Sequence, residues 1–135
     1  MQYFKTMNQK NVLRNLVFTL LIVFTASFSY VSSTKKFNPA GTWEYTAPNV
    51  AEGYTTGEMV IVKQEKGYGV TMVISENYKA EANEVKYQDK SLKFSLYVED
   101  ELITIYGTFK KDKFTGKVSY SEGDFDITAV RKKEK

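Results

Sequence analysis

A chain of 135 residues is long enough for one domain, and a hydrophobic content of 42% is enough to form its core. It contains no cysteine, which excludes disulfides, thiol nucleophiles and cysteine metal sites. It also contains no histidine, the side chain that most often acts as a general base near neutral pH. We therefore expect a protein that is not an enzyme and that needs no metal or cofactor.

Residues 1–29 have the order of a secretion signal, in which positive residues precede an apolar run and small residues follow it. The positive residues are Lys5, Lys10 and Arg14. The apolar run, 16–24, is about nine residues long, whereas a membrane-spanning helix needs roughly twenty. This favours a signal helix cleaved after Ser29 or Ser33. An uncleaved inner-membrane anchor is the alternative, because the run is longer when counted more generously.

Charge is balanced in the rest of the chain. Removing the three basic residues of the signal from a total of 19 leaves 16, which equals the number of acidic residues. The strong positive charge of a nucleic-acid-binding protein is therefore absent. We predict a periplasmic or secreted protein that meets the membrane only through its signal. A flexible leader at 30–37, a folded domain at 38–132 and a basic tail at 133–135 should follow the signal.

From Gly41 onward apolar residues recur at every second position, and turn residues interrupt them about every eleven residues. The predicted strands are 41–47, 57–65, 68–76, 79–88, 91–98, 101–110, 113–121 and 124–132. The short connections between them leave no room for crossover helices, so neighbouring strands should pair antiparallel. The pattern predicts an all-β fold, an eight-stranded up-and-down (meander) barrel preceded by the signal helix.

The interval 78–90 is the most ambiguous part of this assignment. Ala80, Glu81 and Ala82 favour a helix by intrinsic propensity, and a helix there would reduce the strand count to seven. Two flanking hairpins leave little space for a crossing helix, so the strand is the preferred interpretation. Elsewhere the alternation is clear, as in Leu92, Phe94 and Leu96, which share one face.

Gly41-Thr42-Trp43 at the start of the first strand resembles the Gly-x-Trp signature of lipocalins and the wider calycin superfamily. In that family an arginine near the end of the barrel packs across the tryptophan, and Arg131 lies where this partner is expected. The resemblance implies a barrel closed by Gly41, Trp43 and Arg131. In size and export signal the chain is similar to small exported lipocalin-like proteins of Gram-negative bacteria.

A lipocalin-like barrel implies a small hydrophobic or amphipathic ligand in its interior. The inward-facing candidates for ligand contact are Trp43, Met72, Phe94, Leu96, Phe109 and Tyr120. Their bulk favours an interior filled by side chains, whereas small inward residues such as Ala80 and Gly116 favour a cavity. Five tyrosines are candidates for the rims or the outer wall. They are Tyr54, Tyr68, Tyr78, Tyr97 and Tyr106.

The alternative function is that of a protein-interaction or protease-inhibitor module with a filled barrel. The chain resembles, in size and export signal, small periplasmic barrels that inhibit metalloproteases through an N-terminal arm. Here that arm would be Thr34 to Ala40, and its partner would be another protein. Those inhibitors carry a disulfide, which this chain cannot form.

Overall fold

The structure is a computed structural model that describes residues 34–135; the predicted signal helix and its two cleavage positions lie outside the described residues. The described residues form nine strands and no helix. The strands are β1 (Gly41–Thr46), β2 (Thr56–Lys63), β3 (Tyr68–Ser75), β4 (Tyr78–Glu81), β5 (Asn83–Gln88), β6 (Ser91–Val98), β7 (Glu101–Lys110), β8 (Lys113–Tyr120) and β9 (Gly123–Arg131). No helix in this part of the chain could cross a membrane.

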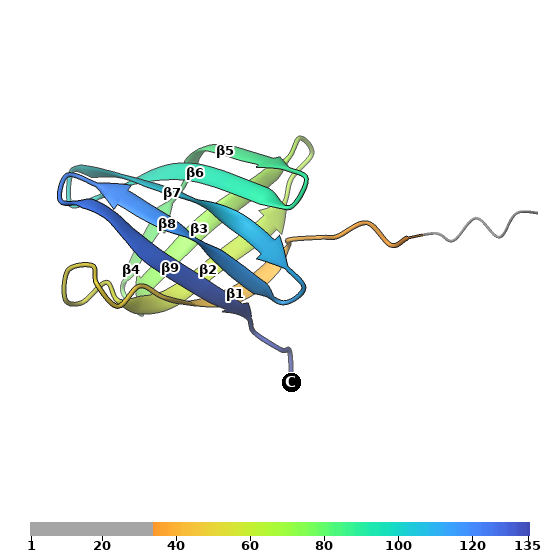
Figure 1. Cartoon of the computed structure of the whole chain (residues 1–135), viewed down its shortest axis with the longest axis horizontal. Helices are drawn as coiled ribbons and strands as arrows, with labels where there is room; N and C mark the ends of the chain where they lie inside the picture. The colour runs from red at the N-terminus through yellow and green to blue at the C-terminus, as the bar shows by residue number, and fades with distance from the viewer. Residues whose placement is uncertain (1–33) are drawn as a thin grey trace, which may run out of the picture. The chain divides into compact units, whose positions relative to one another are not determined.

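The strands form one antiparallel sheet in the order β4-β3-β2-β1-β9-β8-β7-β6-β5. The sheet curls into a nearly closed up-and-down barrel, in which the first and last strands pair with each other (Figure 1). Trp43 stands opposite Arg131 in this pairing. The all-β, antiparallel meander is confirmed, and it is compatible with a lipocalin-like fold. The predicted number of eight strands is wrong.

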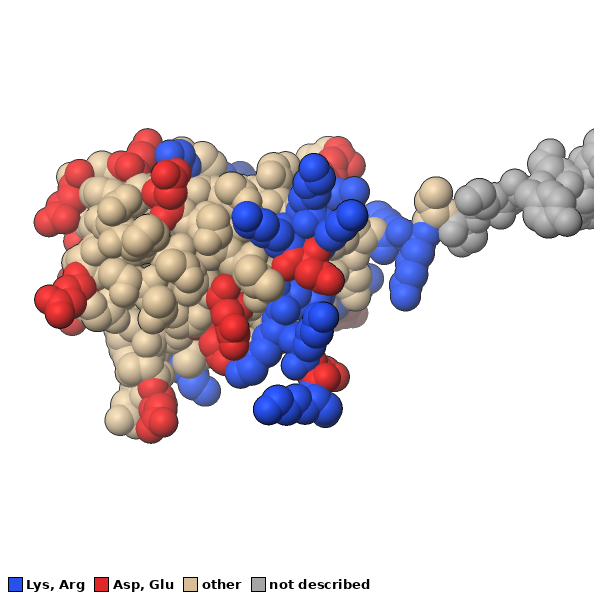
Figure 2. Space-filling model, turned by 60° about the horizontal axis from the view of Figure 1, so that its bottom comes forward, with Lys and Arg blue, Asp and Glu red and all other residues tan. Residues whose placement is uncertain are grey.

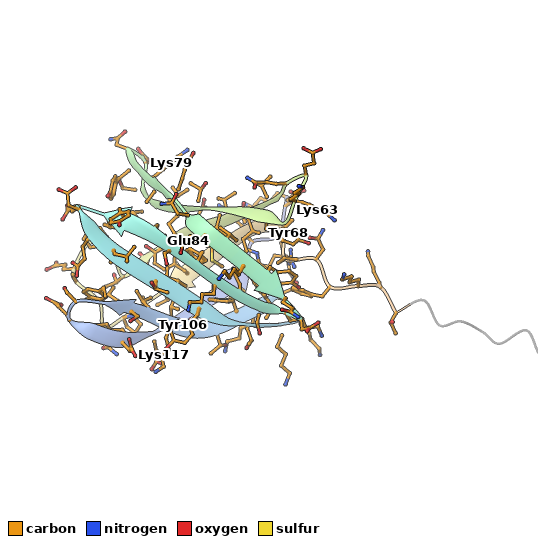
Figure 3. The ribbon with its side chains drawn as sticks, turned by 90° about the horizontal axis from the view of Figure 1, so that it is seen from above. Lys63, Tyr68, Lys79, Glu84, Tyr106 and Lys117 are labelled. Carbon is orange, nitrogen blue, oxygen red and sulfur yellow. The ribbon has the colours of Figure 1, made fainter. Side chains whose placement is uncertain are left out.

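The ninth strand arises because the predicted strand 79–88 is divided. Its first part, β4, pairs with β3, and its second part, β5, pairs with β6. Between them the Ala82 N–H donates to the Val70 carbonyl at 2.8 Å, and Glu84 adopts a positive φ of 52°. The chain therefore moves from one edge of the sheet to the other without a helix (Figure 3), so the helical alternative for 78–90 is wrong.

Alternate side chains point inward, as the period of two predicts. In β6, Leu92, Phe94 and Leu96 are at most 1% exposed, while Lys93 and Tyr97 on the other face are exposed. The inner face also holds residues from seven other strands, and no polar or charged residue of the described chain is buried there. Burial of these apolar side chains supplies the main driving force for folding.

The up-and-down order gives the barrel two distinct ends (Figure 1). β1 begins at one end, together with the β2–β3, β5–β6 and β7–β8 turns. The other end carries the long β1–β2 connection, 47–55, and the β3–β4, β6–β7 and β8–β9 turns. We call the first the Trp43 end and the second the loop end. The interior differs between them.

Candidate ligand cavity

The Trp43 end is filled by aromatic side chains. The ring centroid of Phe109 lies 4.8 Å from that of Trp43 and 5.0 Å from that of Phe114, with tilted planes. Trp43 and Phe114 are both 0% exposed. The Trp43 indole Nε1–H donates to the Pro39 carbonyl at 2.9 Å, so the one polar atom of the ring is satisfied. Aromatic side chains therefore pack the interior of this half of the barrel.

Arg131 covers the indole from outside. Its guanidinium carbon lies 4.4 Å from the Trp43 ring centroid and 5.8 Å from that of Phe37. Nη1 donates to the Ala40 carbonyl at 2.7 Å, Nη2 donates to the Asn38 carbonyl at 2.9 Å, and Nε pairs with Asp112 at 3.0 Å. The planar fork thus binds three acceptors while it stacks on an aromatic face, which an ammonium group cannot do.

Gly41 allows this close approach. Its φ of 140° is one that residues with a side chain rarely adopt, and a Cβ there would lie 3.1 Å from Arg131 Nη1. Phe37 also belongs to this arrangement, since its ring lies 5.4 Å from that of Phe109. Phe37, the last residue of the predicted leader, packs on the barrel.

The loop end contains a cavity of about 220 Å³. Its inner wall is apolar, with Met72, Ile74, Leu96, Ile103, Ile105 and Ile127 from four strands. At its outer part lie the exposed residues Ala51, Glu99 and Glu122, from three of the connections at this end. The cavity therefore runs from the surface into the buried core.

Three tyrosines stand at the entrance. The Tyr45 hydroxyl donates to the Tyr54 carbonyl at 3.2 Å, which ties β1 to the β1–β2 connection. Burial raises the pKa of the Tyr45 phenol. The pKa of Tyr54 is also raised, first by its hydrogen bond to the Glu99 carboxylate and then by burial. Burial and a hydrogen bond to Glu122 raise the pKa of Tyr120 as well. All three phenols are thus kept neutral up to a more alkaline pH than an isolated tyrosine.

Glu101 is held firmly at the same rim. Its Oε1 accepts hydrogen bonds from the Ser121 N–H at 2.9 Å and from the Ser121 hydroxyl. The contact joins the start of β7 to the β8–β9 turn. Glu122 in that turn accepts a hydrogen bond from the Tyr120 hydroxyl at 3.2 Å. These bonds fix carboxylates around an apolar opening.

The structure divides the predicted ligand contacts into two groups. Met72, Leu96 and Tyr120 come together in the lining of the cavity. Trp43, Phe94 and Phe109 do not line it. Trp43 and Phe109 belong to the packed aromatic half of the interior, and Phe94 is 0% exposed.

Sequence reasoning missed Tyr45, Val50 and the three carboxylates of the rim, Glu99, Glu101 and Glu122. Tyr45 follows Trp43 by two positions, so the alternation of β1 could have identified it. Val50 lies in a connection without periodicity, so no sequence signal places it at the cavity. Of the rim tyrosine candidates, Tyr54 lines the cavity, while Tyr97 and Tyr106 are exposed.

The described residues contain no group of three acidic side chains placed to hold a metal ion. No protein-family model matches this chain, and no curated protein matches it either.

Proposed function

We propose that this protein is an exported, non-enzymatic, lipocalin-like β-barrel of the periplasm or the extracellular space, which binds a small apolar or amphipathic molecule at its loop end. The observation that supports this proposal is the 220 Å³ cavity with an apolar wall and a polar entrance. Sites for small molecules have this composition, because apolar contacts supply affinity and a few polar groups orient the ligand. The signal-like order of residues 1–29 supports export.

The volume limits the size of the ligand. An apolar protein cavity of about 150 Å³ accepts one benzene molecule. A cavity of about 220 Å³ has room for one aromatic ring with a short side chain, or for an aliphatic chain of similar size. Long acyl chains, sterols and haem would require displacement of Met72 or Leu96 from the core. We therefore expect a ligand that is small for this fold.

The proposal is tested by titrating isotope-labelled protein with 2-phenylethanol, a neutral probe of suitable size, and recording amide chemical shifts. Saturable shifts at residues such as Met72, Leu96 and Ile103 are expected, with little change near Trp43. In Ala47→Leu the added carbons enter the cavity, because Ala47 lines it and is 1% exposed. That variant should bind at least about tenfold more weakly.

Thr46→Leu is the matched control, since Thr46 precedes Ala47 in the chain and is exposed on the outer face. It should bind the probe as the parent protein does. The proposal fails if the probe causes no saturable shifts, or if Ala47→Leu retains folded spectra and full affinity. Native mass spectrometry of protein purified from its host would detect a co-purifying natural ligand by its mass.

The protein-interaction alternative receives less support. Its proposed arm, Thr34 to Ala40, would have to enter a partner, yet Arg131 binds the carbonyls of Asn38 and Ala40. Phe37 packs on Phe109 in addition. At least this part of the arm is engaged with the barrel and would need to be released first.

A further inference from the structure

The cavity opens within a ring of acidic residues. Four connections form the loop end, namely 47–55, 76–77, 99–100 and 121–122, and none contains lysine or arginine. Their acidic residues are Glu52, Glu76, Glu99, Asp100 and Glu122. Figure 2 shows Asp and Glu gathered at one end of the barrel, whereas Lys and Arg gather toward the other end, where β1 begins. The field at the entrance is therefore negative, although acidic and basic residues are equal in number over residues 30–135.

Two of these carboxylates and a third, at the start of β7, belong to the cavity itself. Glu99, Glu101 and Glu122 line it together with Tyr54 and Tyr120, and no lysine or arginine of the described chain is among its lining residues. Lys79 projects at the same end of the barrel (Figure 3), but it does not line the cavity. A molecule at the entrance thus meets carboxylates and tyrosine rings, the two kinds of group that attract an ammonium ion.

We propose that the ligand is a small cationic amphiphile, a free amine or quaternary ammonium compound whose apolar body fills the cavity and whose charged head stays at the acidic rim. This inference rests on the proposed function, because it names the chemical class of the ligand in that cavity. The inner wall offers no polar partner at Met72, Leu96 or Ile105, so a buried head would lose its hydration without replacement. Only the orientation with the head outward satisfies both ends of the molecule.

The same arrangement disfavours the other classes of occupant. A carboxylate head would sit beside Glu99, Glu101 and Glu122 and be repelled by them. A neutral head makes hydrogen bonds at the rim but is not attracted by the charge of the carboxylates. The side chain of a lysine in another protein carries its ammonium at the free end, so it would have to enter head first into the apolar wall. A free amine enters with its apolar end first.

The experiment compares three probes that have nearly the same apolar body, 2-phenylethylammonium, 2-phenylethanol and 3-phenylpropionate. Dissociation constants are obtained from amide shift titrations of the full domain at low and high salt. We expect the ammonium probe to bind at least about fivefold more tightly than the alcohol, and the carboxylate to bind most weakly. High salt should weaken the binding of the ammonium probe alone, because salt screens its attraction to the carboxylates.

The triple variant Glu99→Gln, Glu101→Gln and Glu122→Gln removes the rim charges and keeps an amide oxygen to accept hydrogen bonds such as that from Ser121. Its preference for the ammonium probe over the alcohol should be largely lost. The matched control is Glu44→Gln, Glu65→Gln and Asp89→Asn, which makes the same change of charge at exposed positions that do not line the cavity. That control should retain the preference for ammonium.

The possible outcomes separate the two proposals. If the alcohol binds in the cavity and the ammonium probe binds no more tightly, the cationic class is refuted and the binding function remains. Tightest binding of 3-phenylpropionate has the same consequence. If none of the three probes binds, both proposals are overturned. An equal loss of ammonium binding in the two triple variants would also refute the assignment to the rim, since overall charge alone would then explain the preference.

Discussion

Trp43 and Arg131 together join the two ends of the folded chain. Trp43 lies in the first strand and Arg131 at the end of the last, and they face each other across the β1–β9 pairing. The guanidinium lies over the indole and also binds residues that precede β1. One side chain therefore covers the largest buried ring and holds the entering chain. Both residues should affect stability, through different interactions.

Trp43→Ala should lower the free energy of unfolding by about 3–5 kcal/mol. The side chain is 0% exposed, so its removal leaves a large cavity beside Phe109 and an unpaired Pro39 carbonyl. Urea denaturation monitored by circular dichroism measures the change. Tyr97→Ala, at a position that is 59% exposed, is the control and should cost less than about 1 kcal/mol. Equal midpoints for Trp43→Ala and the parent protein would contradict the burial.

Arg131→Lys should lower the free energy of unfolding by about 1–2 kcal/mol, because an ammonium cannot reach all three acceptors while it stacks on the indole. Asp112→Ala removes only the ion pair, in which the carboxylate is largely exposed, and should cost less than about 1 kcal/mol. Denaturation of both variants gives the comparison. If Asp112→Ala is the more harmful, the ion pair rather than the stacked fork is the important contact.

At the scale of the elements, β7 and β8 approach each other unusually closely. Gly107 and Gly116 are direct partners in this pairing. A Cβ on Gly107 would lie 2.6 Å from Phe114 Cζ, so the phenylalanine ring occupies the space that a side chain would need. A Cβ on Gly116 would lie 2.1 Å from the Tyr106 carbonyl oxygen. The glycine pair allows the aromatic packing at the Trp43 end.

Gly116→Ala should therefore lower the free energy of unfolding by about 2 kcal/mol or more, because its methyl group meets backbone that cannot move aside. Gly69→Ala in β3 provides a matched control. Its Cβ would lie 2.5 Å from the Gln64 side-chain nitrogen, at the far end of a flexible exposed side chain. That variant should change stability by less than about 1 kcal/mol. Similar losses in both would show that the strand pairing is not especially close at Gly116.

The break between β4 and β5 predicts two effects of opposite sign. Glu84 has a φ of 52°, which is unfavourable for a residue with a side chain, so Glu84→Gly should raise the free energy of unfolding by about 0.5–1 kcal/mol. Glu81→Gly, three residues earlier in β4, should lower it by a similar amount. Thermal denaturation compares the two. A loss in both variants would mean that Glu84 makes contacts that outweigh its backbone strain.

These elements show what the sequence could predict. The alternation of Leu92, Phe94 and Leu96 predicts one face of a strand, because the side-chain period is a local property. The break at Glu84 was missed because the position with positive φ holds a glutamate, and not the glycine or asparagine that usually marks such a position. The division of inward residues between the aromatic half and the cavity was missed too, since it depends on the register of strands distant in sequence. Phe94 and Leu96 lie on one face, yet only Leu96 reaches the cavity.

At the scale of the whole molecule, packing and charge are arranged along the same direction. The aromatic half of the interior lies at the end where basic residues gather, and the cavity lies at the end where acidic residues gather (Figure 2). On the outer wall opposite charges are paired locally, as in Lys117 with Asp126 and Lys132 with Glu58. An apolar cavity is thus combined with a negative entrance.

The raised pKa values of one buried tyrosine and two lysines determine how stability should change at alkaline pH. Burial raises the pKa of Tyr45, and hydrogen bonds to Asp126 and Glu58 raise the pKa values of Lys117 and Lys132. In each case the folded protein holds its proton more firmly than the unfolded chain. The resulting stabilisation is complete below the unfolded pKa values, near 10.0 for tyrosine and 10.5 for lysine, and is lost as the pH rises through the folded values.

The free energy of unfolding should therefore fall between about pH 9 and about pH 12, which urea denaturation across this range would measure. Tyr45→Phe should make the fall shallower, because the phenylalanine ring keeps the apolar contacts and has no proton to lose. The variant also lacks the hydrogen bond to the Tyr54 carbonyl, which lowers its stability at every pH. The quantity to compare is therefore the slope of the free energy of unfolding against pH, not its value at neutral pH. Tyr97→Phe, at an exposed position on the outer wall, should keep the slope of the parent protein. Identical slopes in the two variants would show that burial of Tyr45 at the cavity does not couple its ionisation to folding.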